Sequence, residues 1–471
     1  MNRRKLRSST VVLGGMGVLA ATLTACSSEP DERCVDPVTQ EILPATTTGC
    51  PAAVSTSRRS NATDSAPPAP AAAETFMERR TTEPRPGWQE TVEEQGLIYP
   101  LTRYPDGSLR PYWDESAYYV FSLPEVEALE EVVEELHAMC LAAAAHIVEH
   151  DRFADLGITD PRLAGLIAES WRRRAELPSL YGRFDLRYDG TGPAKMLEYN
   201  ADTPTSLVEA ASPQWFWMED RFPGADQWNS LHERLVDAWK RQAPLLPPGP
   251  LHFAHSDGDE LGEDLMTVAY LRETAAQAGI DTEALSVERI GWDKLSGRFV
   301  DERLRFIRSC FKLYPWEWLT TDRFGPHVLA TLDNGGGTGT TCWIEPAWKM
   351  LLSNKALLAV LWELYPDHPN LLPAYLDGPR DLAGADGAGY VAKPLLGREG
   401  AGVTVHEPGS APVRRDEPCC YQELAPLPDF AGNRVVLGAW VVGDEAAGLG
   451  IRESAGLITD EYARFLPHVI L

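Results

Sequence analysis

The residues RFDLRYDGTGPAKMLEYNADTP, Arg183–Pro204, combine two strand-like runs with a turn between them. The first run, Arg183–Tyr188, alternates polar and apolar side chains, which is typical of a half-buried β-strand. The second run, Lys195–Asn200, also favours a strand, and the Asp-Gly and Gly-Pro pairs between the runs are strong turn formers. We therefore predict a β-hairpin.

Four polar side chains of this hairpin suggest a binding site. Successive side chains of a strand point to opposite faces, so Arg183 and Asp185 share one face, and Glu198 and Asn200 share one face. If the two faces coincide, carboxylate and amide oxygens converge, and these are the ligands that a hard cation such as Mg²⁺ prefers. A nearby arginine suits a phosphate or a carboxylate. The alternative is an exposed hairpin with an ordinary charged face, and this segment alone favours that alternative.

The composition sets limits on the function. The chain has 471 residues, of which 44% are hydrophobic, so it is long enough for a large core and more than one lobe. The net charge is 43 − 69 = −26 and the pI is about 4.8, which argues against a large basic face and hence against a nucleic-acid partner. An acidic surface is compatible with a cationic substrate such as a polyamine, but solubility is the simpler explanation and the one that the composition favours.

The first residues predict export. Basic residues precede an apolar run, Thr10–Ala25, which together are typical of a secretory signal over residues 1–25. The residues Leu-Thr-Ala-Cys that end at Cys26 resemble a bacterial lipobox, which implies cleavage before Cys26 and lipidation of its thiol. Residues 26–76 are rich in Pro, Ala, Ser and Thr, and we expect a disordered tether. The protein would then be anchored to the cell membrane only through this lipid; the alternative is a cytoplasmic protein translated from Met77.

The eight cysteines show no zinc-binding spacing. Cys34 and Cys50 would be able to pair in an exported segment, and this remains open. Cys419 and Cys420 are adjacent, which is poor geometry for a disulfide, so we expect buried free thiols.

Other patterns alternate between helix and strand. We predict helices over Ser122–His150, with a capping box at Ser122 and Glu125, within Pro213–Ala243, and over Leu265–Gly279. The segments LHFAHS, RLRFIRSCFKLY and VVLGAWVVG predict strands. This alternation indicates an α/β architecture. The loop NGGGTGTT lacks the Gly-Lys-Ser/Thr ending of a P-loop.

Three further segments carry residues suited to phosphate chemistry. Lys355 stands at a helix start, Lys393 precedes Pro394 at a strand end, and Arg452 lies in a strand-like run. The glycine-rich loop Gly397–Gly402 would let backbone N–H groups approach phosphates closely. Each segment taken alone is equally compatible with a solvated charge or an ordinary turn.

Taken together, these segments resemble the glutathionylspermidine synthetase family, a branch of the ATP-grasp ligases. The segments that match, in family order, are RPGWQE, PYWDESAYYVF, GRFDL, KMLEYNADTPTSLVEA, YPWEW, EPAWKMLLSNKALLAVLWELYPDHP, VAKPLLGREGAGV, YQELAPLPDF and LGAWVVGDEAAGLGIRES. The resemblance covers Met77–Leu471 and implies an α/β (α+β) ATP-grasp fold with a preceding pre-ATP-grasp-like lobe. A lid would span roughly residues 360–445. Bifunctional members of the family carry an amidase domain, which we do not expect here.

The resemblance also implies a role for individual residues, with ATP as co-substrate and two Mg²⁺ ions. Asp185, Glu198 and Asn200 would hold Mg²⁺, and Arg183 and Arg452 would be the catalytic arginines. The residues that would bind ATP are Lys355, Lys393, Arg398, Glu399, Gly400, Gln422, Glu423, Leu424, Ala425, Leu457, Ile458 and Thr459. Those that would meet the substrates are Thr203, Thr205, Glu263 and Asp264.

These roles predict an ATP-dependent carboxylate–amine ligase. A carboxylate is a poor acyl donor, and ATP would convert it to an acyl phosphate that a small amine attacks, forming an amide. The expected acid is small and peptide-like. The alternatives are an exported lipoprotein whose non-catalytic ATP-grasp-derived cleft binds a peptide or polyamine, and a kinase-like phosphotransferase.

Overall fold

The computed structural model describes residues 77–259, 261–333 and 340–471. Outside these residues lie the predicted signal, the tether, the lipidated Cys26 and the cysteine pair Cys34–Cys50, which therefore stay predictions. Most of the loop NGGGTGTT also lies outside the described residues. No helix within the described part of the chain has both the length and the apolar character needed to cross a membrane.

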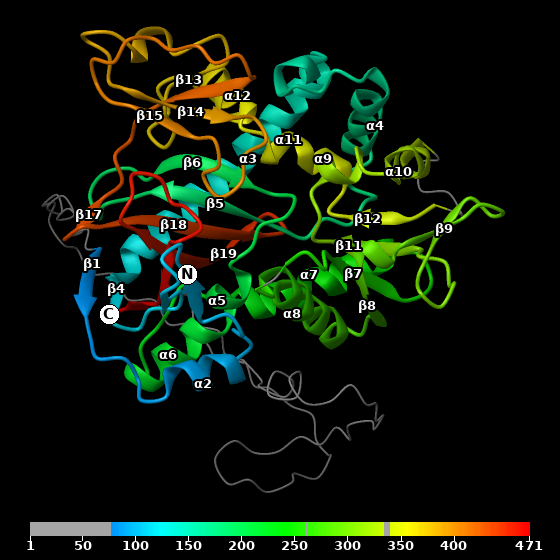
Figure 1. Ribbon diagram of the computed structural model, residues 1–471, viewed down its shortest axis with the longest axis horizontal. Coiled ribbons are helices and arrows are strands. Elements are labelled where there is room, and N and C mark those ends of the chain that lie inside the picture. The colour runs from blue at the N-terminus through cyan, green and yellow to red at the C-terminus, as the bar shows by residue number, and fades with distance from the viewer. Residues whose placement is uncertain (1–76, 260, 334–339) are drawn as a thin grey trace, which may run out of the picture. The chain divides into compact units, whose positions relative to one another are not determined.

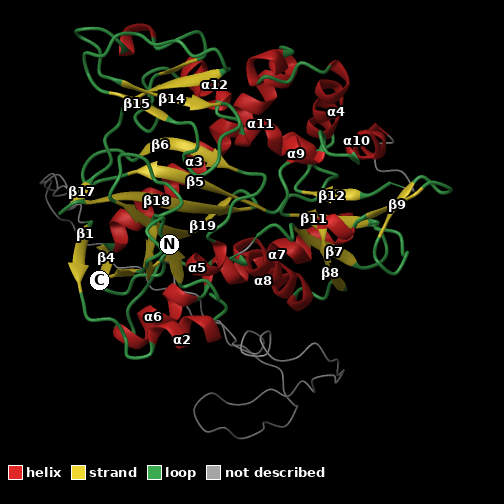
Figure 2. Ribbon diagram, in the orientation of Figure 1, coloured by secondary structure: helices red, strands yellow, loops and turns green. Residues whose placement is uncertain are grey.

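An antiparallel sheet of six strands carries the predicted hairpin (Figures 1 and 2). Its strand order is β20-β19-β18-β5-β6, and the short β17 also pairs with β18. The strands are β5 (Tyr181–Arg187), β6 (Lys195–Asn200), β17 (Asp429–Phe430), β18 (Asn433–Val442), β19 (Glu445–Ser454) and β20 (Arg464–Leu466). The hairpin β5–β6 and the predicted strand VVLGAWVVG in β18 are confirmed.

The long helix α3 (Leu123–Glu149) packs against β18 and β19 of this sheet and also contacts α12 (Ala356–Leu364). Its start is the predicted one, because Ser122 and Glu125 form a capping box that satisfies N–H groups of the first turn. The predicted apolar stripe is buried, from Val126 through Cys140 to Ile147. The helix is therefore a core element with one face on the sheet.

A second antiparallel sheet, β13-β16-β14-β15, carries the predicted Lys393 (Figure 1). Its strands are β13 (Ala374–Tyr375), β14 (Tyr390–Pro394), β15 (Thr404–His406) and β16 (Cys419–Glu423). Cys419 and Cys420 lie in β16 as buried free thiols, as predicted. The glycine-rich loop joins β14 to β15.

A parallel sheet of four strands has the order β12-β11-β7-β8. Its strands are β7 (Leu251–His255), β8 (Thr282–Ser286), β11 (Ser309–Lys312) and β12 (Cys342–Ile344). The predicted strand RLRFIRSCFKLY was too long, because only Ser309–Lys312 forms a strand and Phe306 makes just an isolated bridge with Val300. Asp301 accepts hydrogen bonds from the backbone N–H groups of Arg303 and Arg305, which folds the preceding residues into a turn.

The remaining strands form a three-stranded sheet and two hairpins. The sheet β1-β4-β21 joins β1 (Glu78–Thr81), β4 (Ala117–Phe121) and β21 (His468–Ile470). The hairpins are β2 (Leu101–Arg103) with β3 (Leu109–Pro111), and β9 (Gly291–Asp293) with β10 (Arg298–Val300).

The other helices connect these sheets. They are α2 (Trp88–Glu94), α4 (Pro161–Arg172), α5 (Leu207–Ala211), α6 (Pro213–Arg221), α7 (Leu231–Gln242), α8 (Glu263–Gln277), α9 (Trp316–Leu319), α10 (Gly325–Asp333) and α11 (Met350–Ser353), with short 3-10 turns at Arg152–Leu156, Ala243–Leu245, Val287–Arg289, Ala347–Lys349 and Arg380–Leu382. The helix expected within Pro213–Ala243 is two helices, α6 and α7. The residues between them are not helical because Pro223 and Gly224 interrupt the pattern.

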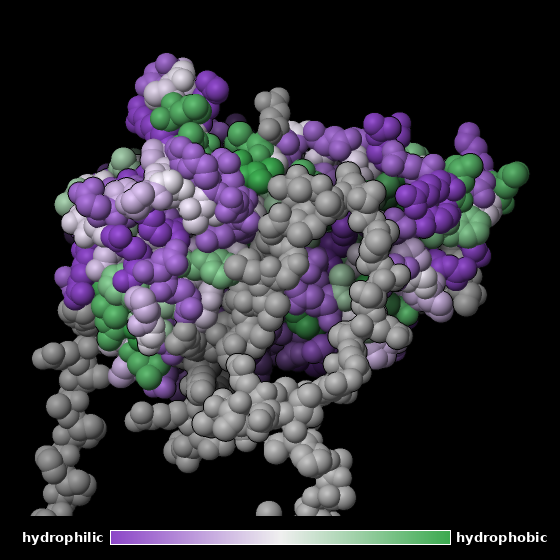
Figure 3. All heavy atoms as spheres, turned by 90° about the horizontal axis from the view of Figure 1, so that it is seen from below, coloured by the Kyte–Doolittle hydropathy of each residue, from purple (hydrophilic) through white to green (hydrophobic). Residues whose placement is uncertain are grey.

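Figure 3 shows one face of the molecule, where hydrophilic residues outnumber hydrophobic ones among the coloured residues and the hydrophobic residues form separate smaller patches. The mixed helices and strands confirm the predicted α/β class.

Candidate active site

The register of the β5–β6 hairpin brings the four polar side chains to one face. Arg183 lies opposite Asn200, and Asp185 lies opposite Glu198, with an irregularity directly after Asp185. Residues that are directly opposite in an antiparallel pair point to the same face. The prediction that the two faces coincide is therefore confirmed.

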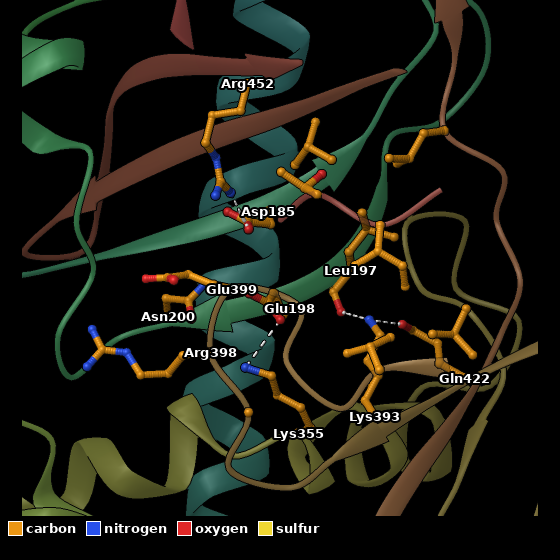
Figure 4. A pocket seen from close by; sticks show the side chains of 18 of the residues that line it. Asp185, Leu197, Glu198, Asn200, Lys355, Lys393, Arg398, Glu399, Gln422 and Arg452 are labelled. Atoms are coloured by element: carbon orange, nitrogen blue, oxygen red, sulfur yellow. Dashed lines mark hydrogen bonds and ion pairs between the residues drawn. The ribbon is translucent and has the colours of Figure 1, made fainter. Parts of the chain in front are cut away.

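Asp185 is held between two arginines. Its carboxylate accepts a hydrogen bond from Nε of Arg183 at 2.9 Å. It accepts a second one from Nη2 of Arg452 at 2.5 Å (Figure 4). Arg452 reaches Asp185 from β19, across β18, which pairs with both β5 and β19. Burial alone would lower the pKa of Arg452, but the Asp185 carboxylate outweighs it and raises the pKa.

Gly438 of β18 leaves the space for this arrangement. It lies opposite Asp185 in the sheet, and a Cβ there would be 3.1 Å from Cδ of Arg183. A larger residue would push the arginine away from the carboxylate. The Arg183–Asp185–Arg452 group therefore comes from two strands, β5 and β19, and the intervening β18 provides the space.

Glu198 is paired with a lysine from the other side of the cavity. Its carboxylate lies 3.2 Å from Nζ of Lys355, which precedes α12, and accepts a hydrogen bond of 2.9 Å from Nδ2 of Asn200. Burial would raise the pKa of Glu198, but Lys355 and Lys393 hold it well below its usual range. Glu198 is therefore ionised at neutral pH.

Lys393 joins the two antiparallel sheets. Its Nζ donates hydrogen bonds to the carbonyl oxygen of Leu197 at 2.8 Å and to Oε1 of Gln422 at 2.7 Å (Figure 4). Gln422 in turn donates to the carbonyl oxygen of Met196 at 3.1 Å. Burial lowers the pKa of Lys393, and the nearby Glu198 acts in the opposite direction.

The glycine-rich loop lies against a second loop, near residues 457–459. Gly400 has a left-handed φ of 72°, and a Cβ there would be 2.6 Å from Cγ2 of Ile458 and 3.1 Å from the carbonyl oxygen of Thr459. The neighbouring Arg398 places its guanidinium 5.5 Å from the ring centre of Trp318. Only glycine permits this conformation together with this close approach.

These groups surround one cavity of about 1200 Å³, counted with its space open to solvent. All the residues that the resemblance assigned to catalysis, metal binding and ATP binding border it, and so do Thr203 and Thr205. The structure thus brings these residues together, and their individual roles stay predictions.

Glu263 and Asp264 lie beside this cavity rather than in its wall. They begin α8, and Glu263 interacts with the side chain of Thr205. Burial raises the pKa of Glu263, and it raises the pKa of Asp264 to about 7. An ammonium group would favour the ionised form of both carboxylates.

The sequence analysis missed the apolar wall of the cavity. This wall is made of Leu197, Pro204, Val391, Val403, Val405, Leu427 and Val436. Two of these residues had a detectable signal. Val391 lies two residues before Lys393 on β14 and so shares its face, and Val436 lies opposite Arg452 in the sheet.

The donor set fits a hard divalent cation. Asp185, Glu198 and Asn200 offer two carboxylates and one amide oxygen from one face of the hairpin, and Glu198 stays ionised. No group of three or more His, Cys, Asp or Glu side chains in the described residues has the geometry to hold a metal. The two carboxylates are instead neutralised by Arg183, Arg452 and Lys355, so metal binding would have to replace these contacts.

Comparisons with known proteins give the same assignment. Residues 79–471 match the sequence model of the family described as glutathionylspermidine synthase preATP-grasp. A Haemophilus influenzae protein provisionally named an acid–amine ligase is 40% identical over 410 residues, and the match covers 83% of this chain and 99% of that protein.

Two longer relatives are more distant. Trypanothione synthetase of Crithidia fasciculata is 26% identical over 82% of this chain and 62% of its own length. The bifunctional glutathionylspermidine synthetase/amidase of Escherichia coli is 25% identical over 76% of this chain and 60% of its own length. This chain therefore spans about three fifths of each of these two proteins.

A solved structure shares the fold. A glutathione synthetase-like effector of Globodera pallida, in its apo form, aligns with a TM-score of 0.50 and 11% identity over 82% of this chain and 96% of that chain. At this identity the likeness shows the ATP-grasp fold alone. Together with the family match, it confirms the predicted fold. The chain belongs to the glutathionylspermidine synthase family.

Proposed function

We propose that this member of the glutathionylspermidine synthase family is an ATP-dependent ligase that joins a small carboxylic acid to an amine through an acyl phosphate. The names of its relatives as ligases and synthetases support ATP-dependent C–N bond formation. The observation that carries the proposal is the cavity, in which two carboxylates and Asn200 of one hairpin face four cationic side chains: Arg183, Lys355, Lys393 and Arg452.

The cationic side chains suit phosphoryl transfer. In the first step a carboxylate oxygen of the acid attacks the γ-phosphorus of ATP, ADP leaves, and an acyl phosphate forms. Positioning and charge neutralisation dominate the catalysis of such a step. Lys355 and Lys393 would bind the phosphates of ATP, while Arg183 and Arg452 would stabilise the charge on the transferring group.

A divalent cation, when bound, would neutralise phosphate charge, and Asp185, Glu198 and Asn200 are the residues that would hold it. Its binding would draw these carboxylates away from Arg183, Arg452 and Lys355. The three cationic side chains would then turn to the phosphates. Nucleotide and cation should therefore bind cooperatively.

The second step forms the amide. The amine nitrogen attacks the acyl carbon, the bond to phosphate breaks, and inorganic phosphate leaves as the nitrogen loses a proton. Water would compete in this step, and the loop Gly397–Gly402 borders the cavity where it would exclude water. The raised pKa values of Glu263 and Asp264 suit a site for the amine.

The test is ADP release across a panel of acids and amines. The proposal expects ADP only when an acid and an amine are both present, with one ¹⁸O moving from a labelled carboxylate into the phosphate. A stable phosphorylated product would select a kinase-like phosphotransferase instead. Mg²⁺-nucleotide binding without ADP release from any pair would favour a binding protein with a non-catalytic cleft.

A further inference from the structure

A buried cluster of charges lies behind Arg452, on the side of β19 that faces away from the cavity. Glu453 directly follows Arg452 on this strand, and successive side chains of a strand point to opposite faces. Arg452 is directed to Asp185 at the cavity, so Glu453 is directed to the protein interior, where it is fully buried. The strand therefore presents a positive charge to the cavity and the next residue's negative charge to the interior.

The carboxylate of Glu453 accepts hydrogen bonds from three residues. Arg79 donates two of them, from Nε at 2.6 Å and from Nη2 at 3.1 Å, one to each carboxylate oxygen. The hydroxyl of Tyr119 donates at 2.6 Å, and Nη2 of Arg464 donates at 2.9 Å. A carboxylate has about four positions at which it accepts hydrogen bonds, so these donors occupy it fully. Removing one of them would leave a buried charge that is less well compensated.

The donors come from three different strands. Arg79 of β1 lies opposite Tyr119 of β4, and Arg464 of β20 lies opposite Glu453 itself. Residues that are directly opposite in an antiparallel pair point to the same face, so the register places Arg79 beside Tyr119 and Arg464 beside Glu453. Arg464 is held in turn by the carboxylate of Asp114. The cluster therefore connects β19 to β1, the first strand that the structure describes.

We propose that Arg79 is a positioning residue for the reaction. Its two parallel hydrogen bonds fix the orientation of the Glu453 carboxylate, and Glu453 fixes the part of β19 from which Arg452 reaches Asp185. The inference rests on the proposed function, in which Arg452 stabilises the transferring phosphoryl group. Arg79 does not border the cavity, so it would act on the reaction only through Arg452.

The neighbouring Arg80 provides a matched control. It lies on the same strand with its side chain on the other face, and it pairs with Glu78 at 2.7 Å. The side chains of Arg80 and Glu78 are 38% and 44% exposed, whereas those of Arg79 and Glu453 are 13% and 0% exposed. A contact between exposed charges contributes little to stability. The two adjacent arginines therefore differ in whether their partner lies behind Arg452.

The test measures kcat and the Kd of Mg²⁺-nucleotide in full-chain variants, with an acid–amine pair that gives ADP release by the native chain. We expect Arg79→Ala to lower kcat by about tenfold or more, since a small misplacement of a catalytic group costs up to roughly 100-fold. The Kd should stay close to the native value, because Lys355 and Lys393 would bind the phosphates before the transition state. Arg79→Lys should recover part of kcat, since it keeps the charge but loses the fork of two donors. Arg80→Ala should match the native chain in both quantities.

Two milder variants keep the test decisive if Arg79→Ala does not fold. Arg79→Lys and Tyr119→Phe each retain most of the cluster, and both should lower kcat while the Kd of Mg²⁺-nucleotide stays close to the native value. Thermal unfolding shows whether each variant is folded at the assay temperature. In an Arg452→Ala background, Arg79→Lys should cause no further loss of the residual turnover, because the effects of residues that act as a unit are not additive.

Native kcat in the folded Arg79 variants would overturn the inference. So would an equal decrease of kcat in Arg80→Ala, a parallel loss of nucleotide affinity and kcat, or a further loss of turnover in the Arg452→Ala background, since each indicates a general effect on the fold. In all these cases ADP release by the native chain would leave the ligase standing. Failure of the proposed function is distinguishable, because then no acid–amine pair would release ADP from the native chain, and the inference would fail with it.

Discussion

At the scale of single residues, the site is a set of charges that neutralise one another. Asp185 is shared by Arg183 and Arg452, and Glu198 is paired with Lys355. Buried charges are costly unless they are paired, so removing one partner of such a contact would leave an uncompensated buried charge and destabilise the protein. The same side chains would bind the ligands: the cationic ones would bind phosphates, and the carboxylates would bind a divalent cation.

Lys393 gives a prediction about pH. Its pKa lies below that of an ordinary lysine, about 10.4, because it is buried. Phosphates bind the protonated form, so nucleotide affinity should be full below the folded-state pKa and fall by up to about tenfold per pH unit above it. Calorimetric titrations of the protein with Mg²⁺-nucleotide at increasing pH measure this decrease in affinity, the alkaline limb of the pH profile.

The substitution Lys393→Arg should remove the alkaline limb, because arginine stays charged. Lys195→Arg is the matched control, since burial also lowers the pKa of Lys195 but this residue lies outside the cavity wall. An alkaline limb that survives in Lys393→Arg would show that a different group titrates.

At the scale of elements, the glycine-rich loop between β14 and β15 depends on one close approach. Gly400 and Gly409 both have left-handed φ angles, 72° and 83°. A side chain at Gly400 would collide with Ile458, whereas nothing lies within 4 Å of a Cβ at Gly409. The two positions therefore separate backbone strain from contact with the cavity.

The comparison of Gly400→Ala with Gly409→Ala tests the loop. Both changes should cost about 1–2 kcal/mol of backbone strain in a left-handed conformation. Only Gly400→Ala should lower turnover, by about tenfold or more, equivalent to roughly 1.4 kcal/mol of transition-state stabilisation. Steady-state kinetics and thermal unfolding of both variants provide the measurement, and equal turnover in the two would remove the loop from the mechanism.

At the scale of the whole molecule, the features set by local patterns were the predictable ones. The hairpin Arg183–Asn200, the helix that begins after Ser122 and the strand β18 all carry periodicity and turn residues that are visible in a short window. The length of strand β11 was overestimated, because the backbone N–H groups of Arg303 and Arg305 donate hydrogen bonds to Asp301 and fold the residues before the strand into a turn.

Long-range contacts were not predictable from local patterns. Arg452 meets Asp185 across 267 residues of sequence, and only the resemblance to a family placed them in one site.

The central claim is that this cavity binds a nucleotide together with a divalent cation. Calorimetric titration of the full chain with ATP, with and without Mg²⁺, tests it directly, using Asp185→Ala and Glu198→Ala as variants. We expect Mg²⁺-dependent binding by the native chain and its loss in both variants. Absence of binding by the folded native chain, or equal binding by the variants, would contradict it.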